Sequence, residues 1–332
     1  MNEVLNRIVK GRTPINIPLT NISVAYLQSK ESGSVSFFPQ VPVDLSTGTY
    51  YIFNKEDLLR DDVQRKPILG KVNPTIVSSD TDTYKCFPEQ IILGYDEIIQ
   101  SDYMRLGAKG MLNIRQSKSK IIADKMFIHR NKLFAQGYFK SGVWGTDLVG
   151  GTDFAQFDNA NATPINTILE TVTAMKRSTG RKPNKLGMGQ RVFDALIQNP
   201  DIMNRVIYGG STLNPATITE KTLAQILGVE EVVIFDTIWN NARLGEKENT
   251  EFICDENSML LVYATSHPAI DEASAGYTFT WTMGQNTTLP IIEWDGEEGT
   301  YSHYIGGMMS IDTKIVCKDL GVFFKNAVAP RA

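Results

Sequence analysis

The sequence predicts a mixed α+β protein, and three observations carry this prediction. Residues 103–136 show one long helical period. Residues 163–265 alternate short amphipathic segments with apolar runs, which indicates a compact α/β unit. The chain after residue 270 is rich in alternating segments that are typical of strands. Two further stretches near the start of the chain are expected to be extended, and each element is justified below.

The composition is that of an ordinary globular protein, and it argues against several classes. The 332 residues include 33 Lys and Arg against 37 Asp and Glu, which gives a net charge of −4. A chain of this length is expected to form two or three domains. The near-neutral balance argues against a dedicated nucleic-acid-binding protein. No run approaches the roughly 18 apolar residues of a membrane span, and the start lacks the apolar segment of a signal peptide.

Patterns of catalytic or metal-binding residues are missing, so we expect no enzyme activity, no metal and no cofactor. The three histidines, His129, His267 and His303, are not at ligand spacing. No serine lies in a G-x-S-x-G elbow. A metal site assembled from distant parts of the chain stays an alternative.

Cysteines and glycines have structural interpretations. Three cysteines at wide spacing favour a reducing compartment, and each is expected to be a buried residue on a strand: Cys86, Cys254 and Cys317. The glycine-rich stretch 142–151 lacks the ending of a phosphate-binding loop. It predicts a flexible connection between domains.

Residues 1–48 and 49–93 are both expected to need a neighbouring subunit. The first stretch has scattered prolines and little periodicity, so it predicts an extended arm with little core of its own. The second has strand-like ends around a centre that is rich in charge, proline and glycine. It predicts a long two-stranded excursion, and an isolated hairpin of this kind is only marginally stable in water.

The predicted helix at 103–136 would be about 50 Å long, and its surroundings are strongly basic. Between Arg105 and Lys140 there are nine Lys or Arg and one acid, Asp124. The favoured interpretation is a solvated face, or pairing with acids of a neighbour such as Glu56, Asp57, Asp61 and Asp62. The alternative is a face turned toward nucleic acid, for which the candidate residues are Arg115, Lys118, Lys120 and Lys125.

Local signals define the α/β unit. Thr163 and Pro164 predict a helix start and Gly180 its end. Shorter helices are expected at 190–198 and 201–208, and Thr217 with Glu220 predicts a capping box for a helix that ends at Gly228. Apolar strands follow at EEVVIFD and MLLVYAT.

The C-terminal region is expected to return toward the long helix. YTFTWTM predicts a strand with Tyr277, Phe279 and Trp281 on one face and threonines on the other, and further strands follow it. The predicted division is an N-terminal arm (1–48), an excursion (49–84), a discontinuous domain that contains the long helix (85–150 and 270–332), and the inserted α/β domain (151–269).

This ordered set of segments resembles the major capsid proteins of tailed bacteriophages with the HK97-like fold. GKVNPTIVSSDTDTYKC is similar to the descending half of that family's E-loop, and KLGMGQRVFDALIQNPDIMNRVIYGGS to its axial-domain helix pair. TEKTLAQILGVEEVVIFDTIWNNARLGE, MLLVYAT and AGYTFTW resemble the axial core and the crossing back to the peripheral domain. The resemblance covers roughly residues 45–330. It identifies the excursion (49–84) as the E-loop, the long helix as the spine helix, and the two domains as peripheral and axial.

The resemblance implies assembly rather than chemistry. Such proteins form pentamers and hexamers of an icosahedral head that encloses double-stranded DNA, with the E-loop and N-arm lying over adjacent subunits. Expected partners are further copies of the chain, a portal protein, packaged DNA, a decoration protein and, given Met1, a separate scaffolding protein. The protein is then expected in the virion, after assembly in the host cytoplasm. Charged E-loop residues are the candidate inter-subunit contacts: Lys55, Glu56, Asp57, Asp61, Asp62, Lys66 and Lys71.

Two alternatives belong to other classes. An encapsulin-like bacterial shell shares the fold, but the long loop and the extended arm favour the virus. A cytosolic enzyme built on residues 163–265 is the second alternative. Some family members join an E-loop lysine to an asparagine of a neighbour, but we expect no such cross-link through Asn326 here.

Overall fold

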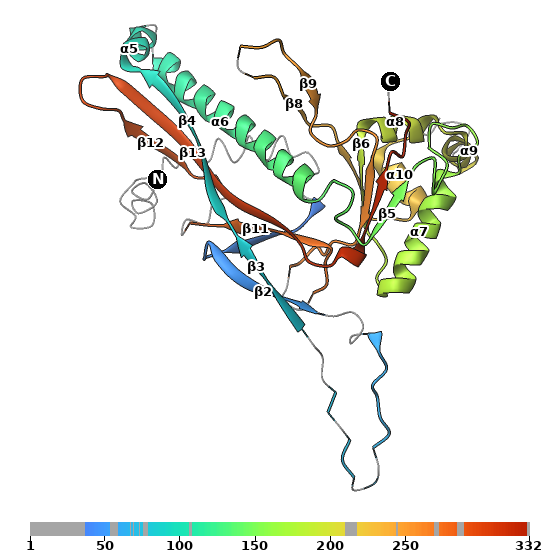
Figure 1. Cartoon of the computed structure of the whole chain (residues 1–332). Helices are drawn as coiled ribbons and strands as arrows, with labels where there is room; N and C mark the ends of the chain where they lie inside the picture. Colours follow the sequence, from blue (N-terminus) through green and yellow to red (C-terminus); the bar gives the residue numbers. More distant parts are fainter. Residues whose placement is uncertain are drawn as a thin grey trace.

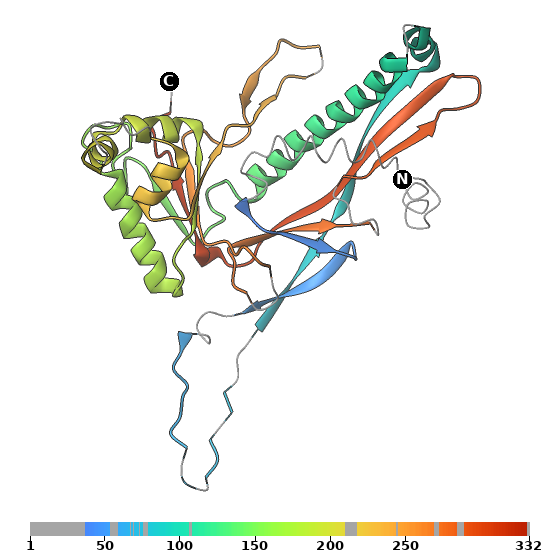
Figure 2. The same cartoon turned by 180° about the vertical axis from the view of Figure 1, so that it is seen from behind.

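The computed structural model describes residues 37–53, 59–66, 68, 70–72, 74–75, 79–105, 108–209, 218–243, 245–268, 272–283 and 289–330. A long helix lies along one β-sheet, and a second sheet with its own helices forms a unit at one end of that helix (Figures 1 and 2). Lys55, Glu56 and Asp57, and the arm before Phe37, lie outside the described residues.

The first sheet, named here the long-helix sheet, is organised around one 14-residue strand, β13. One side of β13 pairs with β4, and the other side pairs first with β12 and then with β11, which in turn pairs in parallel with β1. The strands are β1 (Gln40–Val43), β4 (Phe87–Asp96), β11 (Gly276–Trp281), β12 (Ile291–Asp295) and β13 (Ser302–Ile315). The expected return of C-terminal strands toward the long helix is therefore confirmed for β11, β12 and β13.

The long helix is α6 (Ala108–Gly137), with 30 residues and a length of about 45 Å. It begins later than predicted, because the separate helix α5 (Glu97–Arg105) precedes it. Ile122, Ala123 and Met126 face the sheet and pack against Ile305 and Met309. The helix approaches β13 closely at Gly307, where a Cβ atom would collide with the Ile122 side chain.

The second sheet, the α/β sheet, has the strand order β5-β14-β10-β6-β7. Its strands are β5 (Thr146–Val149), β6 (Lys185–Gly189), β7 (Glu231–Phe235), β10 (Met259–Val262) and β14 (Gly321–Lys325). The helices of this unit are α7 (Pro164–Thr179), α8 (Gln190–Gln198), α9 (Pro200–Gly209) and α10 (Glu220–Leu227), and the short 3-10 helix η1 (Lys318–Leu320) precedes β14.

Two strands of the α/β sheet differ from their predicted assignment. The glycine-rich stretch that predicted a flexible connection contains β5, which pairs in parallel with β14. β14 itself lies between β5 and β10 in this sheet, and it was expected beside the long helix. The predicted boundaries at residues 150 and 270 therefore separate these two strands from the sheet to which they belong.

Helix ends follow local chemistry, with one correction. Pro164 lies in the first turn of α7 as predicted, and Gly180 ends it with a φ of 72°. Gly228 likewise ends α10. The capping box was wrong, because Glu220 is the first residue of α10 and Thr219 is its cap, accepting a hydrogen bond from the backbone N–H of Thr222. Thr217 lies outside the described residues.

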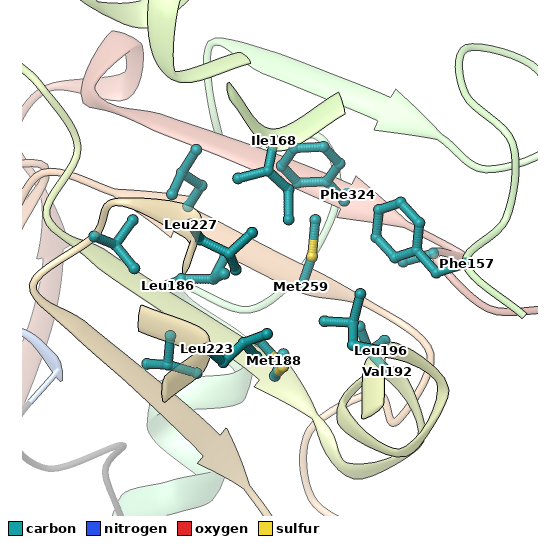
Figure 3. Close-up of a cluster of buried hydrophobic side chains, with 14 of the residues drawn as sticks. Phe157, Ile168, Leu186, Met188, Val192, Leu196, Leu223, Leu227, Met259 and Phe324 are labelled. Atoms are coloured by element: carbon teal, nitrogen blue, oxygen red, sulfur yellow. The ribbon is translucent and has the colours of Figure 1, made fainter. Parts of the chain in front are cut away.

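Two apolar cores support the α/β sheet from its two faces. Figure 3 shows the larger one, in which Ile168, Leu186, Met259 and Phe324 are fully buried. The other is rich in aromatic rings and joins the α/β sheet to α6. Its rings are Phe37, Phe38, Phe134, Tyr138, Phe139, Trp144, Phe235 and Phe323.

The N-terminal arm was expected to have little core of its own, and this is wrong from residue 37 onward. The Phe37 and Phe38 side chains are 0% and 1% exposed in the aromatic core, and Phe37 contacts the Phe134 and Phe235 rings. β1 follows directly and pairs with β11. This part of the chain is therefore integral to the subunit.

Two two-stranded ribbons extend from this body. β2 (Thr47–Phe53) pairs antiparallel with β3 (Ser79–Lys85), which confirms strands at both ends of the predicted excursion. Figure 1 shows the described residues between them, among them 59–66 and 70–72, projecting away from both sheets. The other ribbon, β8 (Ile238–Asn240) with β9 (Thr250–Phe252), extends from the α/β unit beside α6 (Figures 1 and 2).

Some local expectations need correction. Cys86 and Cys254 are buried, but Cys317 is half-buried, and all three lie beside strands rather than within them. In β11 both faces are covered, because Thr278 and Thr280 are buried as well as Tyr277 and Phe279, while Trp281 is only partly buried. Among the helices described, none is both long and apolar enough to cross a membrane.

Candidate assembly surfaces

The described part of the predicted excursion (49–84), for which the name E-loop is kept as a label, exposes apolar side chains. Val63 is 91% exposed and Ile68 is 97% exposed, and Leu59 and Val72 are also exposed. Single exposed apolar residues are ordinary on protein surfaces, but a projecting segment that presents several of them marks an interaction site. The E-loop is therefore the first candidate for contact with another subunit.

The charged residues of the E-loop lie mostly in solvent. Arg60 Nε lies 2.8 Å from Asp62 Oδ1. Asp62, one of the residues predicted to contact a neighbouring subunit, therefore already has a partner within the loop. Asp61 Oδ1 accepts a hydrogen bond from the backbone N–H of Val63, which fixes a local turn. Asp61, Lys66 and Lys71 are exposed and Asp62 is partly buried in its ion pair. The sequence expectation that these residues meet a neighbour stays a prediction.

The four basic residues proposed to face nucleic acid differ in their exposure and in their partners. Arg115 Nε lies 3.1 Å from Glu293 Oε1 and donates to the Tyr95 hydroxyl. That hydroxyl donates to Glu293, and burial, with this bond, raises the pKa of Tyr95 to about 12. Arg115 therefore holds α6 to the sheet. Lys118 is half-buried, whereas Lys120 and Lys125 are exposed on α6.

A groove of about 740 Å³ lies at the outer end of the long-helix sheet. Its lining includes Ile99 from α5, Ile114, Lys118 and Ile121 from α6, and Tyr304 from β13. It borders β4, which pairs only with β13 within the described part of the chain. An open strand edge beside exposed apolar side chains is a second surface suited to contact with another protein chain.

The ribbon β8–β9 was not foreseen from the sequence. Its strands, IWN and TEF, have three residues each, which is too short for a clear alternation of apolar and polar residues. Lys132 of α6 holds it by lying over the ring of Trp239, 4.3 Å from the ring centre. A lysine on the helix and a lone tryptophan more than 100 residues later carry no visible relationship in the sequence.

We next consider the side chains that could bind a metal ion or act as a nucleophile among the residues that the structure describes. No three His, Cys, Asp or Glu side chains within these ranges are grouped to hold a metal ion. His129 and His303 each contact one carboxylate, at 2.5 Å from Glu89 and 2.7 Å from Asp295. Burial raises the pKa of Cys254 to about 12, so its thiol is not a ready nucleophile.

Comparisons with known proteins place this architecture. No protein-family profile matches the chain, and no curated protein sequence is similar to it. Solved structures are similar. A phage-related protein from Bordetella bronchiseptica RB50 superposes with a TM-score of 0.70 at 17% identity, over 96% of this chain and 99% of the other.

Two further structures have lower scores but similar coverage. A capsid protein described as that of a prophage of E. coli CFT073 has a TM-score of 0.54 at 11% identity, over 92% of this chain and 98% of the other. A virus-like particle protein from Pyrococcus furiosus has the same score and coverage at 10% identity. At these identities the similarity concerns the fold. The chain therefore has the HK97-like fold, the α+β architecture found in phage capsid proteins and encapsulin shells.

Proposed function

We propose that this protein is the major capsid protein of a tailed bacteriophage or prophage, and that copies of it assemble into a closed shell. The fold supports a shell-forming role, because structural neighbours include a prophage capsid protein and the mature capsid of bacteriophage PhiM1. The proposal is one of structure rather than catalysis.

The observation that carries the proposal is the E-loop. It projects from the body (Figure 1) and exposes Val63 and Ile68 almost completely. Burial of apolar area stabilises by roughly 25 cal/mol per Å², so these side chains favour a bound neighbour. In a closed shell every subunit can cover its neighbour's loop, so that the exposed apolar side chains of every copy become buried.

Several parts of the proposal go beyond the single subunit. The copies would form pentamers and hexamers of an icosahedral head, with a portal protein and a separate scaffolding protein taking part in assembly. A decoration protein is a further partner. The finished shell would enclose double-stranded DNA in the virion, with assembly in the host cytoplasm. The exposed side chains of Lys120 and Lys125 on α6 would give non-specific contact with phosphates.

An encapsulin-like shell is the second candidate, favoured by the similarity to the Pyrococcus furiosus virus-like particle and to the encapsulin of Synechococcus elongatus PCC 7942. Expression alone and with the neighbouring genes, followed by negative-stain electron microscopy, tests both. Closed particles are expected in at least one preparation, and small oligomers in both would contradict a shell function. The ratio of absorbance at 260 and 280 nm then distinguishes a DNA-filled capsid from an encapsulin.

A further inference from the structure

An aromatic cavity lies at the base of the E-loop. It measures about 230 Å³ and is lined by Val41, Thr49, Tyr50, Tyr51, Tyr277 and Phe279, together with Pro268. We name it the aromatic socket. One liquid water takes about 30 Å³, so the socket has room for a branched aliphatic side chain.

The tip of the same loop carries the side chain that such a socket would accept. Ile68 lies 15 residues after the end of β2 and 11 before the start of β3, and it is 97% exposed. It therefore does not fill the socket of its own chain. The socket is lined by residues of β2, whereas the described loop residues 59–66 lie away from both sheets (Figure 2).

Charge complements shape at these two places. From Val63 to Ser79 the chain carries three cations, Arg65, Lys66 and Lys71, and no Asp or Glu. The socket has an acidic rim: Asp82 accepts a hydrogen bond from the Tyr50 hydroxyl at 2.8 Å. Asp80 is exposed two residues earlier on the same face of β3.

We propose that Ile68 of one subunit inserts into the aromatic socket of the next, with the loop cations against the Asp80 and Asp82 carboxylates. This assignment rests on the proposed shell function and adds the residues that meet. The tip and the socket are different surfaces of one molecule, so the contact is head-to-tail. A head-to-tail contact repeated by rotation closes into a ring.

Disulfide trapping tests the proposal. Thr49 lines the socket and is exposed, so Thr49→Cys with Ile68→Cys places one thiol on each side of the contact. Assembled particles are oxidised with diamide, which takes up the two hydrogens of each thiol pair, and are analysed by non-reducing gel electrophoresis. We expect a ladder of covalent multimers up to the size of the ring, which collapses to monomer with dithiothreitol.

Matched variants keep the result interpretable. Ile68→Cys paired with Ile238→Cys, an exposed position on β8, should give no ladder. The reversals Lys66→Glu and Lys71→Glu are expected to lower particle yield at least tenfold, and Asp80→Lys with Asp82→Lys should restore it.

The outcomes distinguish a failure of the socket contact from a failure of the proposed shell function. Particles that give no ladder, a ladder that stops at dimers, or no recovery by the second reversal would overturn the socket contact and leave the shell function standing. An unmodified protein that forms no particles in any preparation would count against the shell function itself.

Discussion

Lys132 and Trp239 join the long helix to a ribbon that extends from the other unit of the molecule. The Lys132 ammonium lies 4.3 Å from the centre of the Trp239 ring. The ribbon β8–β9 has two short strands, and such ribbons have little stability alone. This contact therefore fixes where the ribbon lies.

We expect a coupling energy of about 0.5–1 kcal/mol between these two residues, the usual range for a partly exposed cation–π pair. A double-mutant cycle with Lys132→Ala and Trp239→Ala, measured by urea unfolding, gives this value. The control cycle pairs Lys132→Ala with Ile238→Ala, and it should give no coupling. Equal coupling in both cycles would mean that the ring contact contributes nothing specific.

Two truncations of the N-terminal arm that differ by only seven residues should have opposite effects on folding of the subunit. A chain that begins at residue 37 keeps Phe37 and Phe38 in the aromatic core and should fold. A chain that begins at residue 44 also loses β1, and deletion of each buried phenylalanine costs about 3–5 kcal/mol. Circular dichroism and thermal melting of both chains test this, and similar melting temperatures would refute it.

Phe279→Ala should destabilise the subunit more than Trp281→Ala, although tryptophan is the larger residue. Phe279 is 5% exposed and stacks on Tyr84 with ring centres 4.6 Å apart, so its removal should cost about 3–5 kcal/mol. Trp281 is only partly buried, and its indole N–H donates to the backbone carbonyl of Asp44. Urea unfolding of both variants checks the order, and a larger loss for Trp281→Ala would contradict it.

Alkaline pH should destabilise the fold through Cys254. Burial raises the pKa of this thiol from 9.0 to about 12, so above pH 9 the unfolded chain loses a proton that the folded chain retains. The contribution of the protonated Cys254 thiol to the free energy of unfolding is complete below pH 9 and is lost as the pH rises toward 12. The free energy of unfolding should therefore fall more steeply between pH 8 and 10.5 in the unmodified protein than in Cys254→Ala. Parallel slopes would show that this thiol does not contribute.

The DNA-facing hypothesis predicts a change in genome retention without a change in the shell. Lys120→Glu with Lys125→Glu should leave empty particles intact and release DNA at lower salt, because fewer phosphates are neutralised. Lys221→Glu with Lys247→Glu, at exposed positions on α10 and between β8 and β9, is the matched control. Release at the same salt concentration as the control would leave α6 with a role in contacts between subunits.

The sequence was most informative where structure depends on nearby residues. Pro164 and Gly180 mark the ends of α7 because caps depend on local backbone chemistry. It was least informative where structure depends on distant partners. β5 lies in a glycine-rich stretch and is a strand only because β14 pairs with it. Phe37 and Phe38 are two apolar residues among prolines, and only the fold shows that a core surrounds them.

For the candidate assembly surfaces too, the sequence was least informative where residues meet distant partners. Exposed charge in the E-loop could be read from composition, because a projecting loop must be solvated. Arg115 could not be assigned in this way, since its partner Glu293 reaches it only through the pairing of β12 with β13. The aromatic socket likewise combines β1, β2 and β11, which are far apart in the chain.

The position of β14 has a consequence for synthesis on the ribosome. Translation produces this strand after every other strand of both sheets, yet it lies between β5 and β10 and supplies Phe323 and Phe324 to both cores of the α/β sheet. A nascent chain lacks this strand until it has left the ribosome. The α/β sheet and both of its cores are therefore completed only after translation has passed β14.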